Sequence, residues 1–74
     1  MHLSVNGVTA EFKREGELAE VTISRRLGLN FTDFLLANGV DVKNFQRTAI
    51  ASRVIIESRQ AERFEGLFKN FFEI

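Results

Sequence analysis

Apolar and polar residues alternate along residues 1–24, which is the pattern of β-strands with one buried face. Asn6-Gly7 lies between the first two alternating runs, and both residues tolerate the positive φ angles of a two-residue hairpin turn. The turn places five apolar residues on one face: Leu3, Val5, Val8, Ala10 and Phe12. The sequence therefore predicts a half-buried antiparallel hairpin.

A charged segment around Gly16 follows, and it is short enough to form a second hairpin turn. Beyond it, Ala19, Val21 and Ile23 alternate with polar residues, so their side chains can join the same apolar face. We therefore expect residues 1–24 to form a three-stranded antiparallel meander. Because a sheet of this size is not stable alone, its apolar face requires a cover.

A short helix is expected over residues 30–38. Asn30 suits the N-cap, since its side chain can accept a hydrogen bond from a free backbone N–H group. Gly39 suits the position after the helix, where a left-handed conformation is common. The apolar stripe of this helix consists of Phe31, Phe34 and Leu35.

Residues 41–72 form a long segment whose apolar positions recur at steps of three and four residues. Asp41 suits an N-cap, and Val40 and Phe45 have the spacing of a hydrophobic staple around it. The recurring apolar residues are Phe45, Ala49, Ile50, Val54, Ala61, Phe64, Phe68 and Phe72. The pattern predicts one long C-terminal helix over residues 41–72. Together with the meander it predicts an α+β fold in a single domain, residues 1–74.

The predicted long helix exceeds what the rest of the chain can cover. It would extend about 48 Å at about 1.5 Å per residue, whereas a chain of this length folds to a diameter of roughly 30 Å. Either the helix breaks near Ser58, in the polar stretch from Glu57 to Gln60, or it stays straight and packs against a second copy. The apolar residues at its end favour the second alternative, because they would otherwise face water. They are Phe64, Leu67, Phe68, Phe71, Phe72 and Ile74. We therefore expect a homodimer whose interface is formed by these six residues.

The composition narrows the class of protein. Ten Lys and Arg residues balance ten Asp and Glu residues, so the net charge provides no general attraction to nucleic acid or to an anionic membrane. The chain has no cysteine, which excludes disulfides, thiol catalysis and cysteine-ligated zinc and is typical of a reducing compartment. No apolar run approaches the ~20 residues that span a bilayer, and no signal peptide is expected. These features predict a cytoplasmic protein that does not associate with membranes.

The sequence contains no motif for catalysis or for a metal. His2 is the only histidine and lies on the polar face of an edge strand. The acidic residues between Glu11 and Glu20 surround one turn but lack the spacing of a calcium-binding loop. Ser24, Ser52 and Ser58 have no base within a recognisable motif. We therefore expect no enzyme activity and no catalytic, cofactor-binding or metal site.

Four basic residues form a patch that could contact the phosphates of a nucleic acid: Arg25, Arg26, Lys43 and Arg47. Lys43 and Arg47 would lie one helical turn apart near the N-terminus of the predicted long helix, where anions are favoured. Alternatively, these residues pair with the acidic segment between Glu11 and Glu20, in the same chain or in a neighbour.

Two DNA-binding folds can be compared with this part of the chain. A helix-turn-helix over Ser24–Gly39 is disfavoured, because its recognition helix would be acidic and apolar. The strand–helix–helix order that begins at Val21 resembles the ribbon-helix-helix family of dimeric regulators over about half of the chain. The resemblance implies that Thr22, Ser24 and Arg26 reach into the DNA groove. The preceding hairpin and the short first helix depart from that family's pattern.

These features together predict a small non-enzymatic regulatory or inhibitory protein that binds another protein and is itself a homodimer. The alternative is a dimeric DNA-binding transcriptional regulator, either ribbon-helix-helix-like or antitoxin-like. A third interpretation is a subunit of a larger assembly that docks through its phenylalanines.

Overall fold

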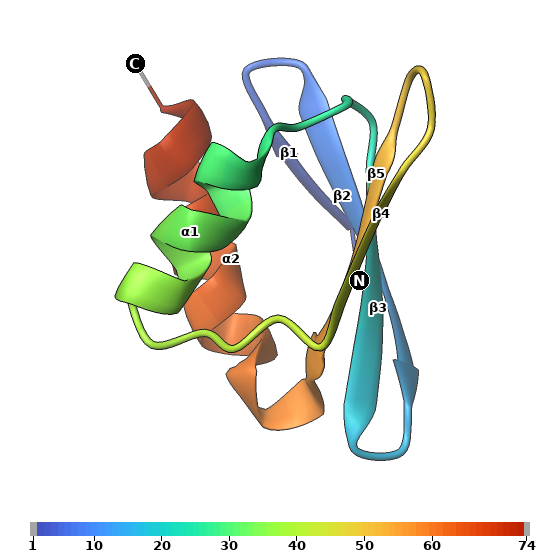
Figure 1. The fold of residues 1–74 in the computed structure, drawn as a ribbon, viewed down its shortest axis with the longest axis vertical. Helices are drawn as coiled ribbons and strands as arrows, with labels where there is room; N and C mark the ends of the chain where they lie inside the picture. The colour runs from blue at the N-terminus through green and yellow to red at the C-terminus, as the bar shows by residue number, and fades with distance from the viewer. Residues whose placement is uncertain (1, 74) are drawn as a thin grey trace.

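The computed structural model describes residues 2–73 and contains a five-stranded antiparallel sheet with two helices on one of its faces (Figure 1). The strands are β1 (His2–Val5), β2 (Val8–Glu15), β3 (Leu18–Ile23), β4 (Asn44–Arg47) and β5 (Ser52–Glu57). The helices are α1 (Leu29–Ala37) and α2 (Ala61–Phe72), and a 3-10 turn, η1 (Ser58–Gln60), precedes α2. The strand order is β1-β2-β3-β5-β4. The predicted α+β class is confirmed, but the prediction of a three-stranded meander is wrong.

The two N-terminal hairpins form where the sequence predicts them. Asn6 and Gly7 have φ angles of 50° and 81°, and Gly16 has a φ of 63°, so both turns use the left-handed conformations that these residues tolerate. Leu3 lies opposite Ala10 in the β1–β2 pair, which places both on the buried face. Local turn chemistry and alternation are sufficient to define this part of the sheet.

Helix α1 also lies close to its predicted position, although its first residue differs. The N-cap is Gly28, without a side-chain hydrogen bond, so the prediction that Asn30 caps this helix is wrong. Gly39 follows the helix with a φ of 87°, and the Val40 N–H donates to the Leu35 carbonyl at 2.9 Å. The helix therefore ends at the left-handed glycine that the sequence predicts.

The predicted helix over residues 41–72 does not exist. Its first half folds as the β4–β5 hairpin, and β5 then pairs with β3, so that β5 lies inside the sheet rather than at its edge. Ser52, Val54 and Ile56 are buried, whereas Arg53 is exposed and Ile55 is only partly buried, which is the two-residue period of a strand. The apolar residues between Phe45 and Val54 have helical spacing, but the segment that contains them forms two strands and a turn.

The chain changes direction at the polar residues Glu57–Gln60, where the first alternative placed a break in the long helix, but the element before this point is a strand and not a helix. Here β5 ends, η1 forms one short turn, and α2 begins at Ala61. In α2 the helical period is correct. Its buried residues are Ala61, Phe64, Phe68 and Phe72.

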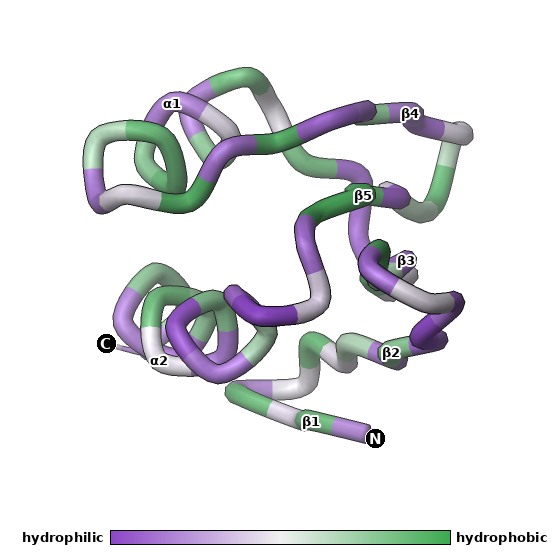
Figure 2. The backbone as a smooth tube through the Cα atoms, turned by 90° about the horizontal axis from the view of Figure 1, so that it is seen from below, coloured by the Kyte–Doolittle hydropathy of each residue, from purple (hydrophilic) through white to green (hydrophobic). Residues whose placement is uncertain are grey.

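The core lies between the two helices and the sheet, and its centre is a group of phenylalanine rings. Phe31 of α1 meets the rings of Phe64 and Phe71 of α2 at centroid distances of 6.0 and 5.0 Å. Figure 2 shows α1 on the side of the sheet that carries β4 and α2 on the side that carries β1. The opposite face of the sheet has no helix over it, and one of its cross-strand rows is entirely polar. That row consists of His2, Glu11, Thr22, Arg53 and Gln46.

Candidate functional site

The most distinctive surface of the molecule is the free edge of β4. The Thr48 N–H donates to the Ala51 carbonyl at 2.9 Å and closes the β4–β5 hairpin. Since backbone direction alternates along an antiparallel strand, Gln46 and Asn44 hydrogen-bond with β5, and Phe45 and Arg47 direct their N–H and C=O groups away from it. The edge therefore presents donors and acceptors in the spacing that another strand requires.

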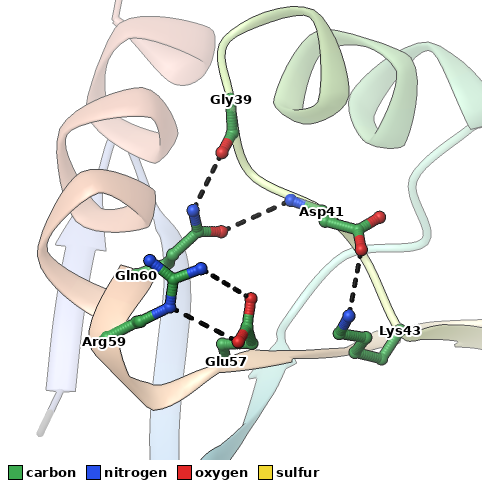
Figure 3. Close-up of polar contacts among 6 residues, drawn as sticks. All are labelled: Gly39, Asp41, Lys43, Glu57, Arg59 and Gln60. Carbon is green, nitrogen blue, oxygen red and sulfur yellow. Dashed lines mark hydrogen bonds and ion pairs between the residues drawn. The ribbon is translucent and has the colours of Figure 1, made fainter.

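A β-bulge limits this edge at its first residue. The Lys43 N–H donates to the Ile55 carbonyl at 2.8 Å, and Asn44 also lies opposite Ile55, so two residues of one strand face a single residue of the other. The Lys43 ammonium lies 3.0 Å from the Asp41 carboxylate (Figure 3). Their hydrogen bond and Coulomb attraction raise the pKa of Lys43 above its ordinary value.

Helix α1 lies beside the free edge of β4 and presents exposed leucines there. Leu29 and Leu36 are 61% and 64% exposed, and their separation of two helical turns places them on one side of α1. A hollow between α1 and β4 is lined by both leucines together with Val42 and Phe45. Polar residues also line it: Thr32, Asp33, Asp41, Lys43 and Asn44. The free backbone of β4 thus lies next to a hollow that contains exposed leucines as well as polar side chains.

Gln60 fixes the loop that joins α1 to β4. Its side-chain N–H donates to the Gly39 carbonyl at 2.9 Å, and its side-chain oxygen accepts from the Asp41 N–H at 3.3 Å (Figure 3). The neighbouring Arg59 forms an ion pair with Glu57 at 3.2 Å. The two Gln60 hydrogen bonds connect the start of α2 with the segment between α1 and β4.

The predicted interface at the C-terminus is mostly covered by the chain's own core. Phe64 and Phe68 are fully buried and Phe72 nearly so, while Leu67 and Phe71 are partly buried against the core. Ile74 lies outside the described residues. The premise that this chain cannot cover its C-terminal phenylalanines is therefore wrong, because the segment is a helix of 12 residues and not one of 32. A homodimer interface at the C-terminal residues stays a prediction, but the uncovered apolar surface from which we predicted it is not present.

The four predicted phosphate-contacting residues do not form one patch. Arg26 donates to the Thr48 carbonyl at 2.8 Å and Arg47 to the Leu27 carbonyl at 3.2 Å, at the end of the sheet where β3 and β4 finish. The Arg25 guanidinium lies 5.8 Å from the centre of the Phe72 ring, near the same end. Lys43 lies at the opposite end of β4, so the predicted helix N-terminus with Lys43 and Arg47 one turn apart does not exist.

The expected alternative pairing of these basic residues with the acidic segment is also not found among residues 2–73. Within that range Glu20 pairs with Arg53 at 3.6 Å, and Glu11 lies 3.3 Å from the ring of His2. No group of three His, Cys, Asp or Glu side chains in the described part of the chain is placed to hold a metal ion.

The three serines each bond to backbone groups. The buried Ser52 hydroxyl accepts from the Leu27 N–H and donates to the Arg25 carbonyl, both at 2.8 Å. Ser24 accepts from the Thr9 N–H at 2.8 Å, and the Ser58 hydroxyl donates to a carbonyl at 3.0 Å. These hydroxyls hold loops against strands.

The sequence prediction does not include Leu29, Leu36 or Phe45 as binding residues. Leu29 and Leu36 lie seven residues apart, on the side of α1 away from its buried stripe, and this spacing is the feature that could have identified them. The edge strand could not be identified in this way, because the same residues fit a helical pattern. The candidate binding surface can be identified only from the tertiary structure, in which α1 and β4 lie side by side.

Comparison of the chain with protein-family models, with curated proteins and with solved structures finds no match. Neither helix in the described residues is long and apolar enough to cross a membrane.

Proposed function

We propose that this chain is a small non-enzymatic regulatory protein that acts by binding a protein strand along β4, in the groove that β4 forms with α1. The observation that carries the proposal is the position of the free backbone groups of Phe45 and Arg47 beside the exposed leucines of α1. In strand addition, main-chain hydrogen bonds supply affinity and pockets for alternate side chains supply specificity.

The groove has both parts that this mode of binding needs. An added strand would bond to the outward backbone groups of β4, and every second side chain would point toward α1. There it would meet Leu29 and Leu36, whose burial is favourable by about 1.5–3 kcal/mol per fully buried side chain. The bulge at Lys43 sets one end of the pairing, and the hairpin turn at Thr48 sets the other.

A random peptide library displayed on phage tests the proposal. We expect selected peptides to alternate apolar and polar residues and, when added to isotopically labelled protein, to shift the amide resonances of Phe45 and Arg47. Arg47→Pro removes an outward N–H group at an edge position where proline is tolerated, and should abolish binding. Arg47→Ala is the matched control, because it removes the same side chain but keeps the N–H group. Peptides that shift other regions, or that bind both variants equally, would refute strand addition.

A second candidate function is DNA binding through Arg25, Arg26 and Arg47, which gather at one end of the sheet. A salt titration against duplex DNA tests it, because phosphate contacts make affinity fall steeply with ionic strength. We expect Arg26→Ala to weaken binding and Arg14→Ala, at the opposite end of the sheet, to leave it unchanged. Absence of binding at low salt eliminates this candidate.

A further inference from the structure

We infer that the strand bound by β4 is the β4 strand of a second copy of this chain, so that two sheets join across a two-fold axis. This inference rests on the proposed strand addition and names its partner. The joined strands would be antiparallel, which places both α1 helices on the same face of a continuous sheet.

Charge selects one register for this pairing. Only Phe45 and Arg47 point their backbone groups outward, so three symmetric registers are available to the edge. Pairing Arg47 with itself places two guanidinium groups directly opposite one another, and pairing Phe45 with itself places Lys43 of one copy opposite Arg47 of the other. Like charges directly opposite across strands are destabilising.

The third register pairs Phe45 of each copy with Arg47 of the other. It has no like-charge pair directly across the joint, and each of its two pairs exchanges both N–H···O=C bonds. It also brings a guanidinium beside an aromatic ring, a favourable contact that the chain already forms internally, with Arg47 5.5 Å from the centre of the Phe45 ring. In this register edge strand β4 therefore meets a second copy of itself without charge repulsion and with a favourable Arg47–Phe45 contact.

The exposed apolar side chains lie where a second copy would cover them. Leu29 and Leu36 of the two α1 helices would face each other above the joined strands. Ile50, at the tip of the β4–β5 hairpin and 80% exposed, would lie alongside the residues that precede β4 in the other copy. Of the four exposed large apolar residues in the described chain, only Leu18 is remote from this edge.

We expect the inferred dimer to be weak and reversible. A standard interface buries about 800 Å² on each partner, roughly a sixth of the 4621 Å² surface of this chain. The inferred interface consists of β4, the hairpin tip and one side of α1 and does not include the α2 phenylalanines, so we expect it to lie at the low end of interface sizes. Because interfaces at the low end of this range are weak and transient, the dimer should dissociate in the micromolar range.

Sedimentation velocity from low micromolar to millimolar concentration tests the dimer. We expect wild-type chain to pass from monomer to dimer over this range, and Leu36→Lys to raise the dimer Kd at least about tenfold, as loss of one buried leucine predicts. Leu18→Lys is the matched control: it changes a 44% exposed leucine on β3 and should leave the Kd unchanged. Circular dichroism verifies that both variants are folded.

Disulfide formation tests the register, because the natural chain has no cysteine. In the inferred register Gln46 lies on the two-fold axis opposite itself, at the Cα separation of about 4.5 Å of a non-hydrogen-bonded pair, which a disulfide can bridge. Gln46→Cys should therefore form a covalent dimer on mild oxidation. Asn44→Cys is the control: its two copies would lie four residues apart along the joint, about 13 Å, and should not cross-link.

The outcomes separate this inference from the proposed function. A wild-type chain that is monomeric at every concentration overturns the second copy as partner, whereas the proposed strand addition depends on the peptide selection alone. A dimer that responds equally to Leu36→Lys and Leu18→Lys, or to neither, overturns the inference because the interface then lies elsewhere. Equal cross-linking of the Gln46→Cys and Asn44→Cys chains overturns the register.

Discussion

Phe31 connects the two helices, and its replacement tests whether the phenylalanine cluster is an internal core. Its side chain is fully buried, and its ring centroid lies 6.0 Å from that of Phe64, 6.5 Å from Phe68, 5.0 Å from Phe71 and 6.1 Å from Phe72. Removing this ring should separate α1 from α2 within one molecule.

The expected loss is large relative to the stability of a chain of this size. Phe→Ala in a core costs about 3–5 kcal/mol, against a total of roughly 4–11 kcal/mol at about 0.05–0.15 kcal/mol per residue. Phe31→Leu is therefore the more informative change, since it keeps most of the volume. It removes edge-to-face ring contacts that contribute about 0.5–1.5 kcal/mol per pair and are not additive, so we expect a loss of about 1–2 kcal/mol in the free energy of unfolding.

Urea denaturation followed by far-UV circular dichroism measures this loss, because the chain has no Trp or Tyr for fluorescence. With a slope of about 1 kcal/mol per molar urea for a small protein, the midpoint should fall by roughly 1–2 M. Phe34→Leu is the control: Phe34 is half-buried and meets the Phe71 ring at 5.4 Å, so its effect should be less than half as large.

A specific result would refute this reasoning. If the cluster formed an interface between molecules, Phe31→Leu would have no effect on the urea midpoint in dilute solution, because its ring would then face water in the wild-type monomer as well. We expect instead that the effect persists in dilute protein, where the chain is monomeric.

The remaining predictions concern single polar groups, glycines and one ion pair. Ser52→Ala leaves the two backbone groups that bond to its hydroxyl without a partner, and urea unfolding should show a loss of about 1–3 kcal/mol; a loss below about 0.5 kcal/mol would contradict the role of this buried hydroxyl. Gly39→Ala should destabilise the fold by about 1–2 kcal/mol because φ is 87° there, whereas Gly66→Ala, in α2 with open space around the new Cβ, should stabilise it by up to about 1 kcal/mol. Thermal unfolding of both glycine variants measures this pair, and shifts of the same sign would contradict it. Asp41→Asn should lower the raised pKa of Lys43 toward its ordinary value, as followed by NMR titration. Since the folded-state pKa is raised, any stability from this ion pair is present below the unfolded pKa and is lost as pH rises through the folded one; an unchanged titration would disprove the coupling.

The secondary structure of residues 1–40 could be predicted well because it depends on turn residues and on the alternation of neighbouring residues. Asn6-Gly7, Gly16 and Gly39 each adopt a positive φ that few other residues tolerate, and they divide the chain into short elements. Between them, alternation leaves one choice of buried face, which the structure confirms for Leu3 and Ala10.

The β4–β5 hairpin was not predicted because its turn carries none of these residues. Ala49 and Ile50 occupy it, and among the described non-glycine residues only Asn6 has a positive φ. Thr48 forms the turn instead, since its hydroxyl accepts from the N–H groups of Ile50 and Ala51 at 3.3 and 3.0 Å. Such turns are a weaker sequence feature than Asn-Gly.

The candidate binding site depends on contacts that no local pattern contains. Arg47 is the one predicted site residue that belongs to the β4 edge, and the sequence indicates it by its charge and not by its backbone. The sequence pattern places Phe45 in a helix and does not indicate Leu29 or Leu36 as binding residues. The site exists because α1 lies beside an edge strand that follows it in the chain, and this proximity is a result of packing.

Local sequence features are sufficient to predict the two N-terminal hairpins, the span of α1 and the buried face of α2, because in these segments the turn residues and the apolar period agree. The strands β4 and β5 instead depend on long-range contacts, because β5 is stabilised by pairing with β3, which lies more than 25 residues earlier in the chain. The same pairing makes β4 the outer strand, and so leaves its backbone free beside α1. A period of three to four residues and a period of two can share the same apolar positions over a short segment, and the non-local partner determines which of them forms.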